Sequence, residues 1–106
     1  MMQREFEFTL PKGWLTPDGE LLRSGLLRLT TGQDELVAQA DRRVLDDPNY
    51  VSLVLLSQVM TRLGHWTQIT PEHLETLFLR DVYYLQSVYR LINQDDPGEV
   101  MPVGEL

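Results

Sequence analysis

The sequence predicts an α+β domain, with an N-terminal β-hairpin packed on a small bundle of two main helices and one short helix. Three observations favour this class. Apolar and polar residues alternate near the N-terminus, as in a half-buried strand. Three later segments carry helix-start signals, and the last third of the chain has apolar residues at helical spacing. We expect residues 1–93 to form one globular domain and residues 94–106 to form a flexible acidic tail.

The β-hairpin is predicted over residues 5–30. Alternation of apolar with polar side chains indicates the first strand, and the Pro-Lys-Gly segment 11–13 is expected to end it. The Pro-Asp-Gly segment 17–19 predicts a turn, because proline presets one backbone dihedral and glycine supplies positive φ. A second strand is expected over residues 21–30, where Gly25 indicates a bulge or a close backbone approach. The hairpin must pack on the helices, because a lone hairpin is marginally stable in water.

Two helices are predicted in the middle of the chain. In the segment 30–35, a threonine precedes acidic residues by three or four positions, which predicts a capped short helix over residues 32–40. Asp47 with the following proline is a second start signal. The predicted helix over residues 48–63 is apolar nearly all round, so we expect it to be buried on several sides. Gly64 is its expected C-terminal cap.

The last helix begins at a third start signal, the Thr-Pro-Glu segment 70–72. Apolar residues then recur at steps of three and four, and an unbroken helix would be about 35 Å long. Asp81 falls near the middle of this stripe, where a bare carboxylate is costly unless paired, so we expect a structural role. One interpretation is that the helix breaks near residues 79–80 and that Asp81 caps a new helix. The other is a buried ion pair of Asp81 with Arg43 or Arg62.

Composition and charge argue against several classes of function. The chain has no cysteine, which excludes disulfides, thiolate metal sites and thiol nucleophiles. Its formal net charge of -7 disfavours nucleic acid and membrane as partners, because an acidic surface repels phosphate backbones and anionic lipid. The sequence has neither a signal peptide nor an apolar run of membrane-spanning length, so we expect a cytoplasmic protein.

Catalytic and metal-binding residues do not converge in the sequence. His65 and His73 are eight positions apart across a predicted helix boundary, so they do not share one helix face as metal ligands would. The serines lack a glycine-flanked elbow, and the glycines are dispersed over separate turns rather than gathered in a phosphate-binding loop. We therefore expect no enzymatic activity, no metal and no cofactor.

Four apolar side chains are candidates for partner binding. Leu79 and Tyr83 lie on the helix face opposite the apolar stripe, so a monomer with one buried face would expose them. Trp14 and Trp66 both fall in predicted loops, and tryptophan and tyrosine are frequent interface anchors. These residues indicate a contact surface for a partner or for a second copy of the chain. The alternative is ordinary exposure, since scattered apolar residues are common on monomer surfaces.

Several segments, in their order and spacing, resemble one protein family. They are residues 25–35 (GLLRLTTGQDE), 41–44 (DRRV), 48–50 (PNY), 53–64 (LVLLSQVMTRLG), 69–72 (ITPE), 77–78 (LF), Asp81, 85–86 (LQ), 89–90 (YR) and 92–93 (IN). Together they resemble the small phage tail assembly proteins of phages and contractile injection systems, and more distantly the tail assembly chaperones. The resemblance covers about residues 5–93 and implies a hairpin followed by helices, with an aspartate in the last helix.

The resemblance implies a non-enzymatic role. Such a protein binds the tape-measure protein or a tail-tube subunit and keeps apolar, polymerisation-prone surface out of water until assembly. Two other functions stay open. One is a structural adaptor of the tail particle, and the other is a small DNA-binding regulator, since short helices joined by a tight turn resemble a helix-turn-helix. The acidic balance argues against the regulator, whose recognition helix would have only Arg80 and Arg90 as cations.

Overall fold

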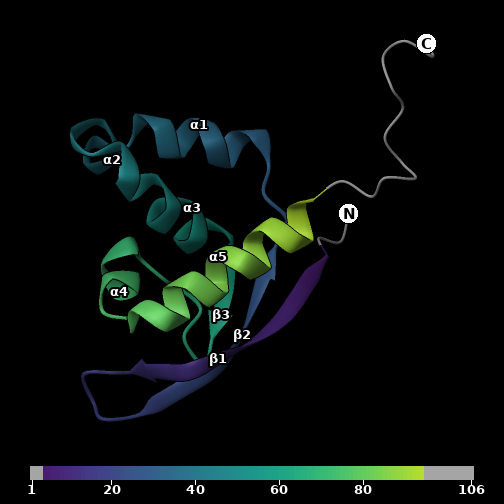
Figure 1. Ribbon diagram of the computed structural model, residues 1–106, viewed down its shortest axis with the longest axis vertical. Helices are drawn as coiled ribbons and strands as arrows, with labels where there is room; N and C mark the ends of the chain where they lie inside the picture. The colour runs from purple at the N-terminus through teal and green to yellow at the C-terminus, as the bar shows by residue number, and fades with distance from the viewer. Residues whose placement is uncertain (1–3, 95–106) are drawn as a thin grey trace.

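A three-stranded antiparallel sheet with the order β1-β2-β3 forms one side of the computed structural model, which describes residues 4–94. The strands are β1 (Glu5–Leu15), β2 (Leu21–Arg28) and β3 (Met60–Leu63). Helix α5 (Leu79–Asn93) crosses in front of the sheet in Figure 1, and the shorter helices lie mainly to one side of it. The predicted α+β class is confirmed, including the packing of the N-terminal hairpin on helices.

Strand β1 is longer than predicted, because it continues through the Pro-Lys-Gly segment. The pairing with β2 shifts between Thr9 and Trp14, so residues 10–13 form a large bulge opposite Arg23. A bulge accommodates proline, which cannot donate to a regular ladder. The Arg23 guanidinium donates hydrogen bonds to two carbonyls of the bulge, at 3.0 and 3.2 Å. The prediction that Trp14 lies in a loop is therefore wrong.

Two features predicted from hairpin glycines are confirmed. The segment 17–19 turns the chain, with Gly19 at a φ of 89° and the Thr16 amide donating to the Glu20 carbonyl at 2.8 Å. Gly25 marks a close approach of two strands. A Cβ atom at this position would lie 2.3 Å from the carbonyl oxygen of Arg62, so only glycine fits without displacement.

Helix α1 (Gly32–Ala40) begins at the predicted capping box. The Thr31 hydroxyl accepts a hydrogen bond from the Asp34 amide at 3.2 Å, and the Asp34 carboxylate accepts one from the Thr31 amide at 2.8 Å. Two of the unpaired donors at the helix start are thereby satisfied. A short helix that was not predicted, α2 (Arg42–Asp46), follows with Asp41 as its cap.

The prediction of one helix over residues 48–63 is wrong at both ends. Asp47 is a cap as expected, but it begins the 3₁₀ helix η1 (Pro48–Tyr50), which leads into α3 (Val51–Val59). The remaining four residues form β3, which pairs with β2. A run that is apolar all round fits a buried strand as well as a buried helix, so periodicity cannot separate the two. Gly64 has a φ of 60° but follows this strand and not a helix.

The last helical segment is broken, and the break precedes the position proposed from the sequence. Helix α4 (Pro71–Glu75) starts at the predicted Thr70 cap, and residues 76–78 separate it from α5. The main core lies between the sheet and helices α3, α4 and α5. Its fully buried members include Leu10, Leu27, Leu56, Val59, Leu63, Leu74 and Leu85. Residues 95–106, which hold most of the predicted tail, lie outside the described residues.

Candidate interaction surface

Asp81 connects helix α5 to the bulge of β1. Its side chain is fully buried, and its two carboxylate oxygens accept hydrogen bonds from the backbone amides of Lys12 and Gly13 at 2.9 and 2.8 Å. The residue lies in the first turn of α5, where the helix dipole favours a negative charge. Both predicted arrangements are therefore wrong, because Asp81 does not cap α5 and its partners are β1 amides rather than Arg43 or Arg62.

Tyr84 adds a second connection between α5 and β1. Its hydroxyl accepts a hydrogen bond from the Thr9 amide at 3.1 Å. Strand β1 is at one edge of the sheet, so these α5 side chains bond to amides that no neighbouring strand uses. One face of α5 is thus held on β1 by polar contacts and on the core by Leu85, which is fully buried.

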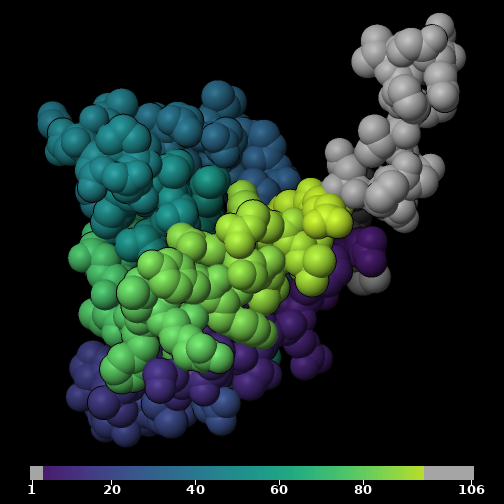
Figure 2. Space-filling model, viewed as in Figure 1, coloured from purple at the N-terminus to yellow at the C-terminus, as the bar shows by residue number. Residues whose placement is uncertain are grey.

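The opposite face of α5 presents apolar side chains to solvent. Leu79 is 62% exposed and Tyr83 is 59% exposed, and Phe78, just before the helix, is 53% exposed. In Figure 2, α5 forms a green-to-yellow band across the visible surface, and no other described segment lies over it. Leu79 and Tyr83 therefore lie where a partner can reach them.

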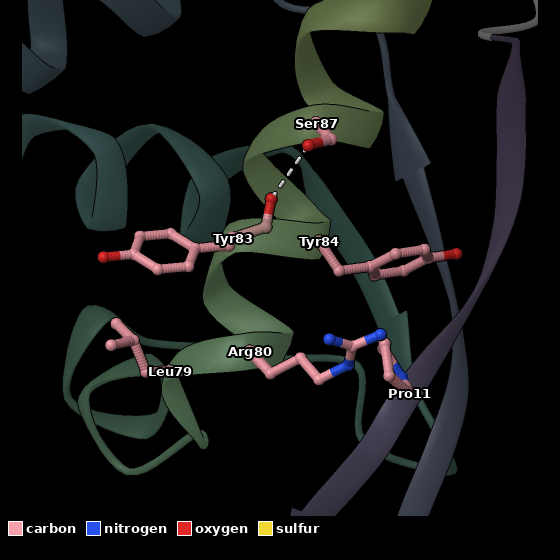
Figure 3. Close-up of a pocket in the computed structure, with 6 residues that line it drawn as sticks. All are labelled: Pro11, Leu79, Arg80, Tyr83, Tyr84 and Ser87. Atoms are coloured by element: carbon pink, nitrogen blue, oxygen red, sulfur yellow. Dashed lines mark hydrogen bonds between the residues drawn. The ribbon is translucent and has the colours of Figure 1, made fainter.

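A cleft of about 530 Å³ lies along α5 beside β1. Figure 3 shows Arg80 and Tyr84 extending from the helix toward Pro11, whereas Leu79 and Tyr83 extend to the other side of the helix. The Ser87 hydroxyl donates a hydrogen bond to the Tyr83 carbonyl at 3.1 Å and stays on the helix surface. The cleft is lined by Pro11, Leu79, Arg80, Tyr83, Tyr84 and Ser87.

A second cleft, of about 620 Å³, lies on the side of α5 that faces α3 and α4. Leu79 and Tyr83 line both clefts, so they form a ridge between two hollows. The acidic residue of the second cleft, Glu75, accepts a hydrogen bond from the Tyr50 hydroxyl. Burial and this bond raise the pKa of Tyr50 to about 12.

The two tryptophans do not join this surface. Trp14 is 3% exposed and belongs to the core, so its prediction as an accessible anchor is wrong. Its indole nitrogen donates to the Thr76 hydroxyl at 2.9 Å, and its ring packs edge-on against Trp66 at 5.1 Å between centroids. Trp66 is half-buried and also packs on His73, at 5.1 Å. These aromatic rings hold α4 against the hairpin.

Sequence reasoning missed Phe78 and four of the residues that line the first cleft, Pro11, Arg80, Tyr84 and Ser87. Phe78 is exposed because the chain leaves the helix at residues 76–78, which a periodicity argument that assumes a continuous helix cannot show. Pro11 and Tyr84 meet only because β1 and α5 pack together, although 73 positions separate them in the printed sequence. No local signal in the sequence identifies that contact.

Across residues 4–94, no group of three or more histidine, cysteine or acidic side chains is arranged to hold a metal ion. His65 bonds to Glu20 at 2.9 Å, and His73 accepts a bond from the Thr70 amide at 3.1 Å. None of the described helices has the length and apolar character needed to cross a membrane.

Comparison with known proteins identifies no relative. No protein-family model, curated protein or solved structure matches this chain significantly.

Proposed function

We propose that this chain is a non-enzymatic assembly protein of a phage tail or contractile injection system. In this proposal it acts in the cytoplasm as a chaperone that binds the tape-measure protein or the tail-tube protein. The observation that carries the proposal is the exposed ridge of Leu79 and Tyr83 between two clefts on α5. The resemblance to phage tail assembly proteins supplies the class of partner.

The physical basis is the contrast between the two faces of α5. Asp81 and Tyr84 bond one face to β1, so the helix is held in place before any partner arrives. Preorganised surfaces bind with a smaller loss of conformational entropy. The other face offers an aromatic and an aliphatic side chain beside hollows, an arrangement typical of interface anchors. A partner that covers this ridge removes apolar surface from water, which favours binding by about 25 cal/mol per Å².

The test is co-expression of the tagged full chain with the proteins encoded by its neighbouring genes. We expect the tape-measure or tube protein to be retained with the wild-type chain. The variant Leu79→Ser/Tyr83→Ser should retain at most about one tenth as much of that partner protein, as expected for the loss of two central anchors. Leu36→Ser/Leu45→Ser is the matched control, because these leucines are 69% and 70% exposed on α1 and α2.

Two results would contradict the proposal. One is that neither the tape-measure nor the tube protein is retained by the wild-type chain. The other is that the control variant loses as much partner as the α5 variant, because binding would then not depend on the ridge. If the chain remains in purified mature particles, it is a structural adaptor rather than a chaperone.

A further inference from the structure

The charges on the exposed face of α5 differ in sign from those of the whole chain. The formal net charge is -7, with sixteen acidic and nine basic residues. Helix α5 has three charged residues, and its one acid, Asp81, is buried against β1. The two that reach solvent are Arg80 and Arg90, so this face is positive on an acidic protein.

Arg80 lies in a cleft that borders the ridge, whereas Arg90 lies in a separate hollow further along α5. Arg80 lines the cleft beside β1, and Arg90 lines a third hollow of about 310 Å³ between α3 and α5. Within residues 4–94, neither guanidinium takes part in an ion pair or a hydrogen bond. Glu75, the acid of the second cleft, accepts a hydrogen bond from Tyr50 and forms no ion pair with either arginine. Both cations are therefore available to a partner's carboxylates.

The spacing of these residues produces a pattern along the helix. Ten positions separate the two arginines, which corresponds to about 15 Å along a helix axis. At about 100° per residue, Tyr83 and Ser87 face between the two arginines and Leu79 faces just beyond Arg90, so the exposed tyrosine has a cation on each side. Leu91, which is also exposed, faces just beyond Arg80.

We propose that the partner segment that occupies this face is an acidic amphipathic helix, an inference that rests on the proposed function. Its apolar residues would pack on Leu79 and Tyr83, and its flanking carboxylates would pair with Arg80 and Arg90. A helix fits two hollows on either side of a ridge, because helices pack by inserting ridges into grooves. Addition of a strand to β1 is disfavoured, because Asp81 and Tyr84 already occupy amides of that edge.

The experiment measures retention of the co-expressed tape-measure and tube proteins by the full chain at two salt concentrations. Arg80→Glu/Arg90→Glu should reduce retention by about tenfold or more, because it places like charges opposite the partner's carboxylates. Raising NaCl from about 50 mM to about 500 mM should weaken the wild-type complex by screening these pairs. Arg4→Glu/Arg42→Glu is the control, because it changes the net charge by the same amount. Both arginines are exposed; Arg4 directly precedes β1, and Arg42 is the first residue of α2.

A synthetic peptide series separates the chemistry from the biological partner. It consists of a helix with a leucine stripe flanked by glutamate, a glutamine version and a lysine version, each measured by fluorescence anisotropy. The glutamate peptide should bind the wild-type chain about tenfold more tightly than the glutamine peptide. The lysine peptide should prefer Arg80→Glu/Arg90→Glu. Equal binding of the glutamate and glutamine peptides would overturn the inference.

The outcomes distinguish the two proposals. If the wild-type chain and Arg80→Glu/Arg90→Glu retain the tail component equally, the proposed function stands and the acidic helix is wrong. If the wild-type chain retains no tail component but discriminates the peptides by charge, the surface chemistry stands and the proposed function is wrong. Analytical ultracentrifugation tests whether a second copy of the chain occupies this face instead. If the wild-type chain self-associates and the arginine variant does not, a second copy occupies the face and the partner helix is wrong.

Discussion

At the scale of single residues, Asp81 is the polar group on which the position of α5 depends. Its carboxylate satisfies two amides of a bulge that has no second strand on that side. Arg23 donates hydrogen bonds to two carbonyls of the same bulge. The Asp81 carboxylate thus satisfies amides of this irregular segment, and the Arg23 guanidinium satisfies its carbonyls. A strand with a neighbouring strand on each side needs no such support, because its two ladders pair both kinds of group.

We expect Asp81→Ala to lower the free energy of unfolding by about 3 kcal/mol, because it leaves the buried amide of Gly13 and the partly buried amide of Lys12 without acceptors. Asp81→Asn should cost less, since its carbonyl oxygen still accepts one bond. Urea unfolding followed by circular dichroism measures both. The exposed Glu7 on β1 provides the control, and Glu7→Ala should change the value by less than about 0.5 kcal/mol. An unchanged stability of Asp81→Ala would contradict the anchoring role.

The ion pair of Arg28 and Asp34 joins the sheet to α1 and makes stability depend on pH. Two guanidinium nitrogens donate to the two carboxylate oxygens, both at 2.7 Å, and Arg28 also donates to the Gln58 carbonyl. The bonds from Arg28, with those from Thr31, lower the pKa of Asp34 to about 2. The ordinary value is 3.8, so the carboxylate binds protons less readily in the folded chain than in the unfolded chain.

A lowered pKa in the folded state means that the stabilisation is complete above the unfolded pKa and is lost as the pH falls. We expect Asp34 to contribute about 2 kcal/mol at neutral pH, and this should disappear between about pH 4 and pH 2. Urea unfolding across this range gives the curve. Asp34→Asn should be less stable at pH 7 and should lose less stability on acidification. Parallel curves for the two proteins would contradict the assignment.

At the scale of the elements, the sequence predicts features that depend on neighbours in the chain. Thr31, Asp47 and Thr70 all act as caps where expected, because capping involves residues only two or three positions apart. Prediction from the sequence fails where contacts with distant segments determine the local structure. Residues 60–63 become a strand because β2 lies beside them, and Trp14 is buried because α4 packs on the hairpin. Tertiary context overrides the local pattern in both cases.

A substitution at Gly25 tests how closely β2 packs against the neighbouring strands of the sheet. A Cβ atom would meet the Arg62 carbonyl at 2.3 Å and the Phe8 ring at 2.4 Å, and a backbone carbonyl cannot rotate away. We expect Gly25→Ala to destabilise the protein by about 2 kcal/mol or more through overpacking. Gly32→Ala is the control, because its Cβ has open space at the start of α1. Thermal unfolding should separate the two variants, and equal melting temperatures would contradict the close approach.

At the scale of the whole molecule, the sequence predicts the ridge of the candidate surface but not the clefts beside it. Helical spacing alone places Leu79 and Tyr83 opposite the buried stripe, and the structure exposes both. The clefts beside them are lined by β1, α3 and α4, and both β1 and α3 come from distant parts of the chain. A ridge can therefore be predicted from one helix, whereas its hollows require the complete fold.

We therefore expect side chains on the buried face of α5 to determine stability and those on its exposed face to determine binding. Leu79→Ser/Tyr83→Ser should change the free energy of unfolding by less than about 1 kcal/mol, because both side chains are mostly exposed. Leu85→Ala, on the buried face of the same helix, should cost about 3 kcal/mol, because it leaves a cavity in the core. Urea unfolding of the two variants compares the faces directly. If Leu79→Ser/Tyr83→Ser unfolds the chain, the ridge belongs to the core and cannot be the surface that a partner covers.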